Sequence, residues 1–244
     1  MLITGGSRGI GAATARLAAT RGYDVAVSYV TDSVSAASMV DECRAAGARA
    51  MAWRADVAVE TDVIALFEAV DAELGTPRVV VNNAGTLHTA SRLDQFDVAR
   101  LREVVDVNVI GAIVVLREAV RRMSTRHGGE GGAIVNVSSA AAYLGSPNEY
   151  IDYAATKGAL DTVTIGLSKE VATEGIRVNA VRPGLIYTQI HERSGIPNRV
   201  DRLAPGTPMQ RGGRPDEVAE AILWLASDAA SYVTGTFVNC AGGR

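Results

Sequence analysis

Residues 1–11 read MLITGGSRGIG, a short apolar segment that runs directly into a glycine-rich loop. The loop glycines Gly5, Gly9 and Gly11 follow the spacing glycine, three residues, glycine, one residue, glycine. Glycines between a first strand and a first helix let the backbone approach a pyrophosphate, which then lies at the positive end of the helix. The position of the loop therefore predicts a nucleotide site, although glycines alone are also typical of an ordinary turn.

The rest of the chain alternates short β-branched runs with longer helical segments. Runs such as VVV at 79–81 and AIV at 133–135 are apolar on both faces, as expected of parallel strands covered by helices on both sides. We expect strands at residues 2–3, 25–29, 49–55, 79–82, 133–137, 177–181 and 236–239. We expect helices at residues 10–20, 33–46, 61–74, 99–123, 153–173 and 215–226. This alternation predicts a single α/β domain spanning residues 1–244, a Rossmann-type doubly wound parallel sheet of about seven strands.

Residues 183–214 interrupt this alternation. The segment is rich in proline and has weak periodicity. A loop of this length inside a compact domain is usually functional, so we expect it to form a lid over the substrate. The first strand has only three residues before the glycine loop, so we also expect the natural chain to extend upstream of Met1.

The composition excludes several classes of protein. The chain has 244 residues, 48% hydrophobic and 21% charged, which is typical of a globular protein and not of a disordered one. A net charge of −3 without a basic block argues against nucleic-acid binding, and no apolar stretch reaches the ~18 residues of a membrane span. Two distant cysteines and three scattered histidines predict no metal site. With no secretory or transit peptide visible, we expect a cytoplasmic protein.

The end of the second predicted strand bears on the choice of dinucleotide. An acidic residue there would bind the adenosine ribose hydroxyls and favour NAD. This strand ends at Tyr29 without a carboxylate, and Asp32 comes three residues later. Arg8 lies inside the glycine loop, where its guanidinium can bind a 2′-phosphate. We therefore favour NADP(H) as the cofactor, with NAD(H) as the alternative.

Tyr153 and Lys157 are four residues apart on a predicted helix, so both project from one face. A phenol with an ordinary pKa of about 10 is a poor acid or base at neutral pH, and a nearby ammonium lowers that pKa. The chain has 22 arginines and only two lysines, which makes this pairing rare by chance. Arginine is bulkier and does not replace lysine here. We interpret Lys169, which has no comparable context, as a solvated residue.

Ser138 and Ser139 end the fifth predicted strand, at the edge where parallel sheets bind ligands. With this pair the chain resembles the short-chain dehydrogenase/reductase family over its full length. It is similar to the branch that contains 3-oxoacyl-carrier-protein reductases and glucose dehydrogenases. The resemblance is carried by TGGSRGIG at 4–11, Asp56-Val57, NNAG at 82–85, Asn108, Ser138-Ser139, Tyr153-x3-Lys157 and PGLIYT at 183–188.

The resemblance implies an oxidoreductase that transfers a hydride between a nicotinamide and a carbonyl or secondary alcohol. Tyr153 would be the acid/base, and Lys157 would bind the nicotinamide ribose and lower the pKa of Tyr153. Ser139 would orient the substrate oxygen, because the family places the second serine of the pair in the site. Its interval of fourteen residues to Tyr153, against the usual thirteen, requires a one-residue insertion within 140–152. Asn108 would help to hold a proton-relay water near Lys157.

The resemblance also implies a set of cofactor contacts. Asp56 and Val57 would contact the adenine, and the turn at 82–85 would flank the adenine ribose. Residues 183–188 would cover the nicotinamide, with Thr188 meeting the carboxamide. The cofactor-binding residues implied or inferred are Gly5, Ser7, Arg8, Gly9, Ile10, Gly11, Tyr29, Asp56, Val57, Asn82, Ala84, Gly85, Tyr153, Lys157, Pro183, Gly184, Ile186 and Thr188.

The sequence leaves the substrate of the predicted pocket open among several classes. The predicted pocket residues fit a sugar, a small ketone or an acyl thioester; they are Tyr143, Leu144, Tyr150, Tyr187 and His191. Residues 191–193 are candidate lid contacts. The alternative function is a non-catalytic NADP-binding sensor or regulatory protein, which needs the glycine loop but not the catalytic side chains. The family resemblance implies a homotetramer or homodimer that uses the helices at 99–123 and 153–173.

Overall fold

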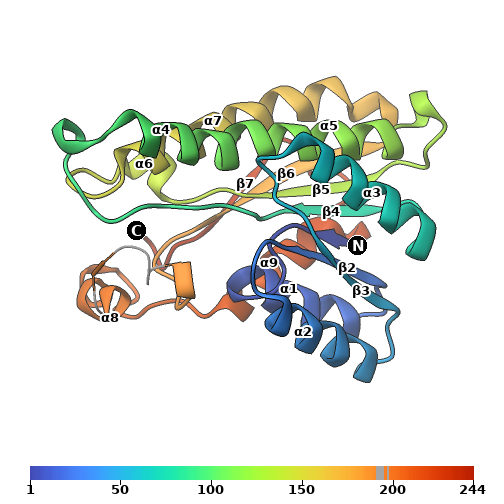
Figure 1. The fold of residues 1–244 in the computed structure, drawn as a ribbon, viewed down its shortest axis with the longest axis horizontal. Helices are drawn as coiled ribbons and strands as arrows, with labels where there is room; N and C mark the ends of the chain where they lie inside the picture. The colour runs from blue at the N-terminus through green and yellow to red at the C-terminus, as the bar shows by residue number, and fades with distance from the viewer. Residues whose placement is uncertain (191–194, 197) are drawn as a thin grey trace.

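The computed structural model describes residues 1–190, 195–196 and 198–244 of the chain (Figure 1). In this part, seven parallel strands form one sheet in the order β3-β2-β1-β4-β5-β6-β7. The strands are β1 (Leu2–Ile3), β2 (Val25–Tyr29), β3 (Ala50–Arg54), β4 (Val79–Asn82), β5 (Gly132–Val137), β6 (Ile176–Pro183) and β7 (Phe237–Cys240). The strand order reverses at β1, which pairs with both β2 and β4. The predicted doubly wound α/β class is confirmed.

Helices cover both faces of this sheet (Figure 1). One face packs against α1 (Gly9–Thr20), α2 (Ser33–Ala45) and α9 (Pro215–Ala226). The other packs against α3 (Glu60–Leu74), α5 (Ala112–Met123) and α7 (Ile151–Glu170). Successive strand residues alternate between the two cores: Val80 lies in the second and Val81 in the first. Burial on both faces explains why the strands read as continuous apolar runs.

The long helix predicted at 99–123 is interrupted, which corrects that prediction. It consists of α4 (Val98–Val105), a π-helical segment η2 (Asp106–Gly111) and α5. In the π-helical segment Asn108 is buried, and its side chain bonds to the backbone of Thr86. A Cβ on Gly111 would lie 2.6 Å from the Val57 carbonyl oxygen, so the segment packs closely against the chain after β3. Periodicity of apolar residues does not reveal a single wide turn of this kind.

The segment at 183–214 contains short structure of its own. Helix α8 (Arg199–Leu203) is followed by η6 (Ala204–Gly206), and Ile186 forms an isolated bridge with Gly213. The remaining short elements are η1 (Leu93–Gln95), η3 (Thr125–His127), α6 (Ala141–Leu144), η4 (Ala172–Glu174) and η7 (Asp228–Ala230). Among the described residues, no helix has the length and apolar character needed to cross a membrane.

Candidate active site

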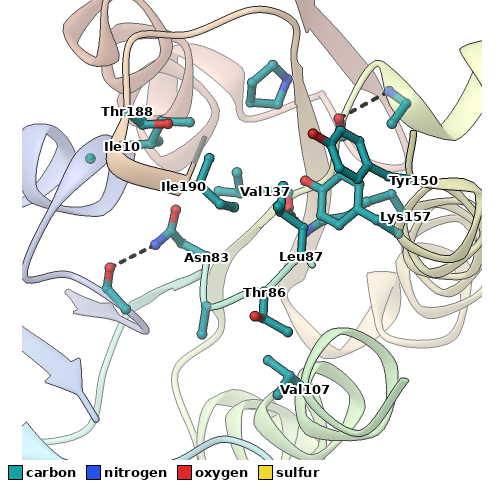
Figure 2. Close-up of a pocket in the computed structure, with 18 of the residues that line it drawn as sticks. Ile10, Asn83, Thr86, Leu87, Val107, Val137, Tyr150, Lys157, Thr188 and Ile190 are labelled. Carbon is teal, nitrogen blue, oxygen red and sulfur yellow. Dashed lines mark hydrogen bonds between the residues drawn. The ribbon is translucent and has the colours of Figure 1, made fainter. Parts of the chain in front are cut away.

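A cavity of about 1340 Å³ opens beyond the carboxyl ends of the strands. It exceeds the ~300–1,000 Å³ of a typical small-ligand pocket, so it has room for a dinucleotide and a substrate. Its wall is built by the segments that follow β1, β2, β3, β4, β5 and β6. In Figure 2, Ile10 and Thr188 lie on one side of the cavity, and Tyr150 and Lys157 lie on the other.

The glycine loop has the conformation of an anion cradle. Gly5 and Gly9 have φ angles of +63° and +57°, a region that favours glycine. A Cβ on Gly11 would lie 2.5 Å from the Gly5 carbonyl oxygen, so the turn closes only around a glycine. The Asn83 side chain ties the loop to the end of β4, donating to the carbonyls of Thr4 (2.8 Å) and Gly5 (3.0 Å). Within the described chain no side chain caps α1, so its first amides face an incoming anion.

The part of the cavity beside the glycine loop and the end of β2 is lined by the Arg8 guanidinium and the Asp32 carboxylate. The Asp32 carboxylate caps α2 by accepting from the Ser35 amide at 2.9 Å. This backbone hydrogen bond, with a smaller contribution from Arg8, holds the pKa of Asp32 below its ordinary value. The exposed Arg8 lines the cavity, and among the described residues its guanidinium has no hydrogen-bond or ion-pair partner. Arg8 is thus free to bind an anion, whereas Asp32 is already committed to the helix.

The two serines after β5 have different partners. The Ser138 hydroxyl is buried and donates to the Asp161 carboxylate at 2.6 Å. The Ser139 hydroxyl lines the cavity, accepts from the Ala141 amide at 3.1 Å, and is hydrogen-bonded to Tyr153. Both serines line the cavity, but the Ser138 hydroxyl is bound to Asp161, so Ser139 is the better candidate to meet a substrate and its role stays a prediction.

The loop between Ser139 and Tyr153 has an unusual backbone. Helix α6 ends at the left-handed Gly145, and two non-glycine residues, Ser146 and Asn148, follow with φ angles of 45° and 63°. Such backbone conformations cost energy and persist only where surrounding packing holds them. The loop is therefore a defined part of the cavity wall, to which Ser146 belongs.

Tyr153 and Lys157 lie together at the cavity, with the ammonium 5.6 Å from the centre of the phenol ring. The ammonium is buried and donates to the Val137 carbonyl at 2.7 Å. Burial raises the pKa of Tyr153 to about 12, against a smaller lowering by the hydrogen bond with Ser139. The lowering expected from Lys157 is not found, because burial dominates and the ammonium points to Val137. Burial also lowers the pKa of Lys157 to about 8, opposed by the Asp161 charge.

Three predicted site residues are not in the cavity wall. The Asn108 amide donates to Thr86 (2.8 Å) and Thr156 (3.1 Å), and Asn82 donates to Asn136 (3.1 Å). Asn82, Asn108 and Gly11 therefore hold together the loops and helices that carry the wall residues, and do not line the cavity themselves. The predicted residues that do line the cavity are Gly5, Ser7, Arg8, Gly9, Ile10, Tyr29, Asp56, Val57, Ala84, Gly85, Ser139, Tyr153, Lys157, Pro183, Gly184, Ile186 and Thr188.

Only some of the residues predicted to line the substrate pocket do line the cavity. Leu144 and Tyr150 line the cavity as predicted. Tyr143 and Tyr187 do not, because their hydroxyls donate to the Arg244 carbonyl (2.9 Å) and the Asp201 carboxylate (2.7 Å). The predictions for His191 and for lid contacts at 191–193 lie outside the described residues.

An ion pair between Arg199 and Glu149 also forms part of the wall, and sequence reasoning missed it. The guanidinium carbon of Arg199 lies 5.4 Å from the centre of the Tyr150 ring. Arg199 is one of many arginines and no sequence motif marks it. Among the described residues, no group of three or more His, Cys, Asp or Glu side chains is placed to hold a metal ion.

Known proteins are similar to this chain in sequence and in fold. A family profile described as Enoyl-(Acyl carrier protein) reductase matches residues 5–244. The chain is 53% identical over 243 residues to the uncharacterized oxidoreductase YgfF of Escherichia coli, covering 100% of this chain and 98% of that protein. The structure is similar to 3-ketoacyl-(acyl-carrier-protein) reductase from Brucella melitensis complexed with NADH (TM-score 0.92, 32% identity, 100% of this chain and 96% of that chain). It is also similar to a short chain dehydrogenase from Burkholderia cenocepacia in complex with NADP (TM-score 0.90, 33% identity, 99% of this chain and 96% of that chain). The chain therefore belongs to the short-chain dehydrogenase/reductase family of nicotinamide-dependent oxidoreductases.

Proposed function

We propose that this protein transfers a hydride between NADP(H) and a carbonyl or secondary alcohol, with Tyr153 as the acid/base. The observation that carries the proposal is the meeting of Ser139, Tyr153 and Lys157 in a cavity that begins at the glycine loop. A non-catalytic sensor needs the loop but has no use for these three side chains together. The enzyme is therefore the better interpretation.

The residues around the cavity fit a dinucleotide. The loop would hold the pyrophosphate, because its glycines leave no Cβ in the turn and the first amides of α1 are available. Asp56 and Val57 would face the adenine, and Thr188 the carboxamide. The preference for NADP(H) rests on the unpartnered guanidinium of Arg8, since the two structural relatives carry NADH in one case and NADP in the other.

A bound nicotinamide supplies or accepts the hydride, and the protein's own residues manage the proton. With its pKa raised to about 12, Tyr153 is a neutral phenol at pH 7, the form that can donate a proton. An alkoxide forming from a carbonyl is a much stronger base than a phenolate, so it takes the proton from Tyr153. The Ser139 hydroxyl would donate a hydrogen bond to the same oxygen and so orient it.

Residues 183–214 would act as the substrate lid. Helix α8 of this segment carries Arg199, whose ion pair with Glu149 joins it to the loop before α7. The bridge between Ile186 and Gly213 ties the two ends of the segment together. The described parts of the segment are thus held at its base and by this ion pair at the cavity wall, which fits a lid.

The same proposal includes assembly into a homodimer or homotetramer. Helices α4 and α5, which η2 joins end to end, run along one side of the molecule with α7 beside them (Figure 1). Apolar side chains remain exposed on these helices and on η2; they are Leu101, Val105, Ile110, Ile113 and Ile165. Exposed apolar side chains gathered on neighbouring helices are typical of an interface between subunits.

The Tyr153→Phe variant tests the proposed function. Removing the phenol hydroxyl should lower turnover of a panel of ketones and aldehydes by about 10²- to 10⁴-fold, the usual contribution of a general acid. NADPH binding, measured by fluorescence titration, should stay unchanged because the ring remains. Tyr232→Phe is the matched control, since Tyr232 is fully exposed. Normal turnover by Tyr153→Phe would contradict the proposal, and NADPH binding by a wild-type protein inactive on every substrate would favour the sensor.

A further inference from the structure

A partly buried ion pair joins β6 to α7, the helix that carries Tyr153 and Lys157. The Arg182 guanidinium contacts one oxygen of the Asp161 carboxylate through Nε (3.0 Å) and Nη2 (2.8 Å). The guanidinium carbon also lies 3.8 Å from the centre of the Phe237 ring and 5.6 Å from that of Tyr143. Arg182 is therefore held by aromatic rings and by the carboxylate at once, and Asp161 has one fixed orientation.

The other oxygen of Asp161 connects this pair to the active site. It accepts from the Ser138 hydroxyl at 2.6 Å, and the same hydroxyl lies 3.3 Å from the Lys157 carbonyl. The Lys157 ammonium in turn donates to Val137, the residue before Ser138. Asp161 and Lys157 are four residues apart, one helical turn on α7. The carboxylate thus helps to hold β5, which presents Ser139, against the helix that presents Lys157.

Asp161 is also the charge that acts on Lys157. Lys157 is only 4% exposed, and burial alone disfavours its charged form. On the elements packed around it, α7 carries Asp152, Tyr153 and Asp161, α4 carries Arg100 paired with Asp152, β6 carries Arg182, η2 carries Asp106, and β5 carries no charged residue. Among these groups Asp161 raises the pKa of Lys157, against the larger lowering by burial.

We propose that Asp161 is a positioning residue that keeps the buried Lys157 charged and seated at the end of β5, with Arg182 fixing the direction of its carboxylate. The inference rests on the proposed function, because it assigns Asp161 a role only if a charged Lys157 is needed for turnover. Asp161 touches neither substrate nor cofactor in this scheme. It acts through Lys157 and through Ser138, which precedes the substrate-facing Ser139.

The pH dependence of kcat/KM for carbonyl reduction tests this role. The wild-type profile should fall on its alkaline side near pH 8, because Lys157 loses its proton well before Tyr153, whose pKa is about 12. Asp161→Asn keeps the size of the side chain but removes its charge, so this fall should move to lower pH by about 1 unit, the usual effect of one close opposite charge. Arg182→Gln leaves Asp161 charged, so its profile should stay in place or move to higher pH.

The double variant Asp161→Asn/Arg182→Gln completes the comparison and avoids an unpaired buried cation. It should resemble Asp161→Asn, because both lack the carboxylate. A purely structural role would lower activity and thermal stability in every variant without separating their pH profiles. The inference would be overturned if the pH profiles of Asp161→Asn and of the double variant coincided with that of the wild type. It would also be overturned if the profile of Arg182→Gln moved to lower pH. Neither result would affect the proposed function. A wild-type protein without turnover would instead overturn the proposed function itself, and the inference with it.

Discussion

Arg8→Ala should shift the cofactor preference from NADPH toward NADH. Arg8 is exposed at the cavity, beside the proposed adenosine site, and in the described chain its guanidinium has no hydrogen-bond or ion-pair partner. A guanidinium–phosphate contact is a charge-assisted hydrogen bond worth about 1.5–3 kcal/mol. At about 1.4 kcal/mol for each factor of ten, removing it should lower the ratio of kcat/KM for NADPH to that for NADH by about 10- to 150-fold. The value for NADH itself should stay constant, since NADH has no 2′-phosphate.

Asp32→Ser supplies the opposite perturbation at the same end of the cavity. Serine retains a cap for α2, so the helix loses little stability, while the carboxylate that would repel a 2′-phosphate is removed. The NADPH-to-NADH ratio should therefore rise. Arg92→Ala, a change at an exposed arginine outside the cavity wall, is the control and should leave the ratio unchanged. An unchanged ratio in Arg8→Ala, or a fall in Asp32→Ser, would refute the assignment of Arg8 to the phosphate.

Two further predictions concern stability and assembly. Arg100→Met should destabilise the protein by about 3–5 kcal/mol in urea unfolding, because it leaves Asp152 as a buried unpaired carboxylate; the two side chains are 10% and 3% exposed. Arg92→Met, which breaks an ion pair on the surface, should cost at most about 1 kcal/mol, and equal effects of the two variants would contradict this reasoning. The mass in solution, measured by light scattering, should be about two or four times the chain mass of 25.5 kDa. Ile110→Glu should reduce that mass and Val34→Glu, on the exposed face of α2, should not; a monomeric wild type would refute the assembly.

The fold was predictable because the information that determines it is local. Each central strand is a short apolar run, and most are followed by a segment with helical periodicity, which leaves few arrangements other than a doubly wound parallel sheet. The ends of elements were less accurate. The sixth strand extends to Pro183, two residues beyond its predicted end at 181, because pairing with β7 continues there. A partner strand far along the chain decides such ends, and no local pattern contains it.

In the candidate site, too, the residues of contiguous motifs were predictable and those placed by tertiary packing were not. The glycine loop and the pair Tyr153–Lys157 are contiguous motifs, so their sequence spacing is also their spatial relation. Asn108 fits no such rule: its amide is used by Thr86 and Thr156, which only the π-helical segment brings into reach. Tyr143 looks like a pocket residue by position, yet its hydroxyl reaches the end of the chain. The direction of a side chain in a loop is set by tertiary packing, which the sequence does not display.

The surroundings of Lys157 explain why this position holds a lysine in a chain that otherwise uses mostly arginine. Its ammonium sits 2.7 Å from the Val137 carbonyl, and even a Cβ added to Gly85 would lie 3.6 Å from it. A planar guanidinium with five donors is larger and needs more acceptors, whereas the compact ammonium fits this buried position with one carbonyl. Lys169 is the contrasting case, exposed in the last turn of α7, where any cation interacts favourably with the helix dipole. The position of Lys157 therefore selects the size of the cationic group and not only its charge, which is why arginine, used almost everywhere else, does not replace it.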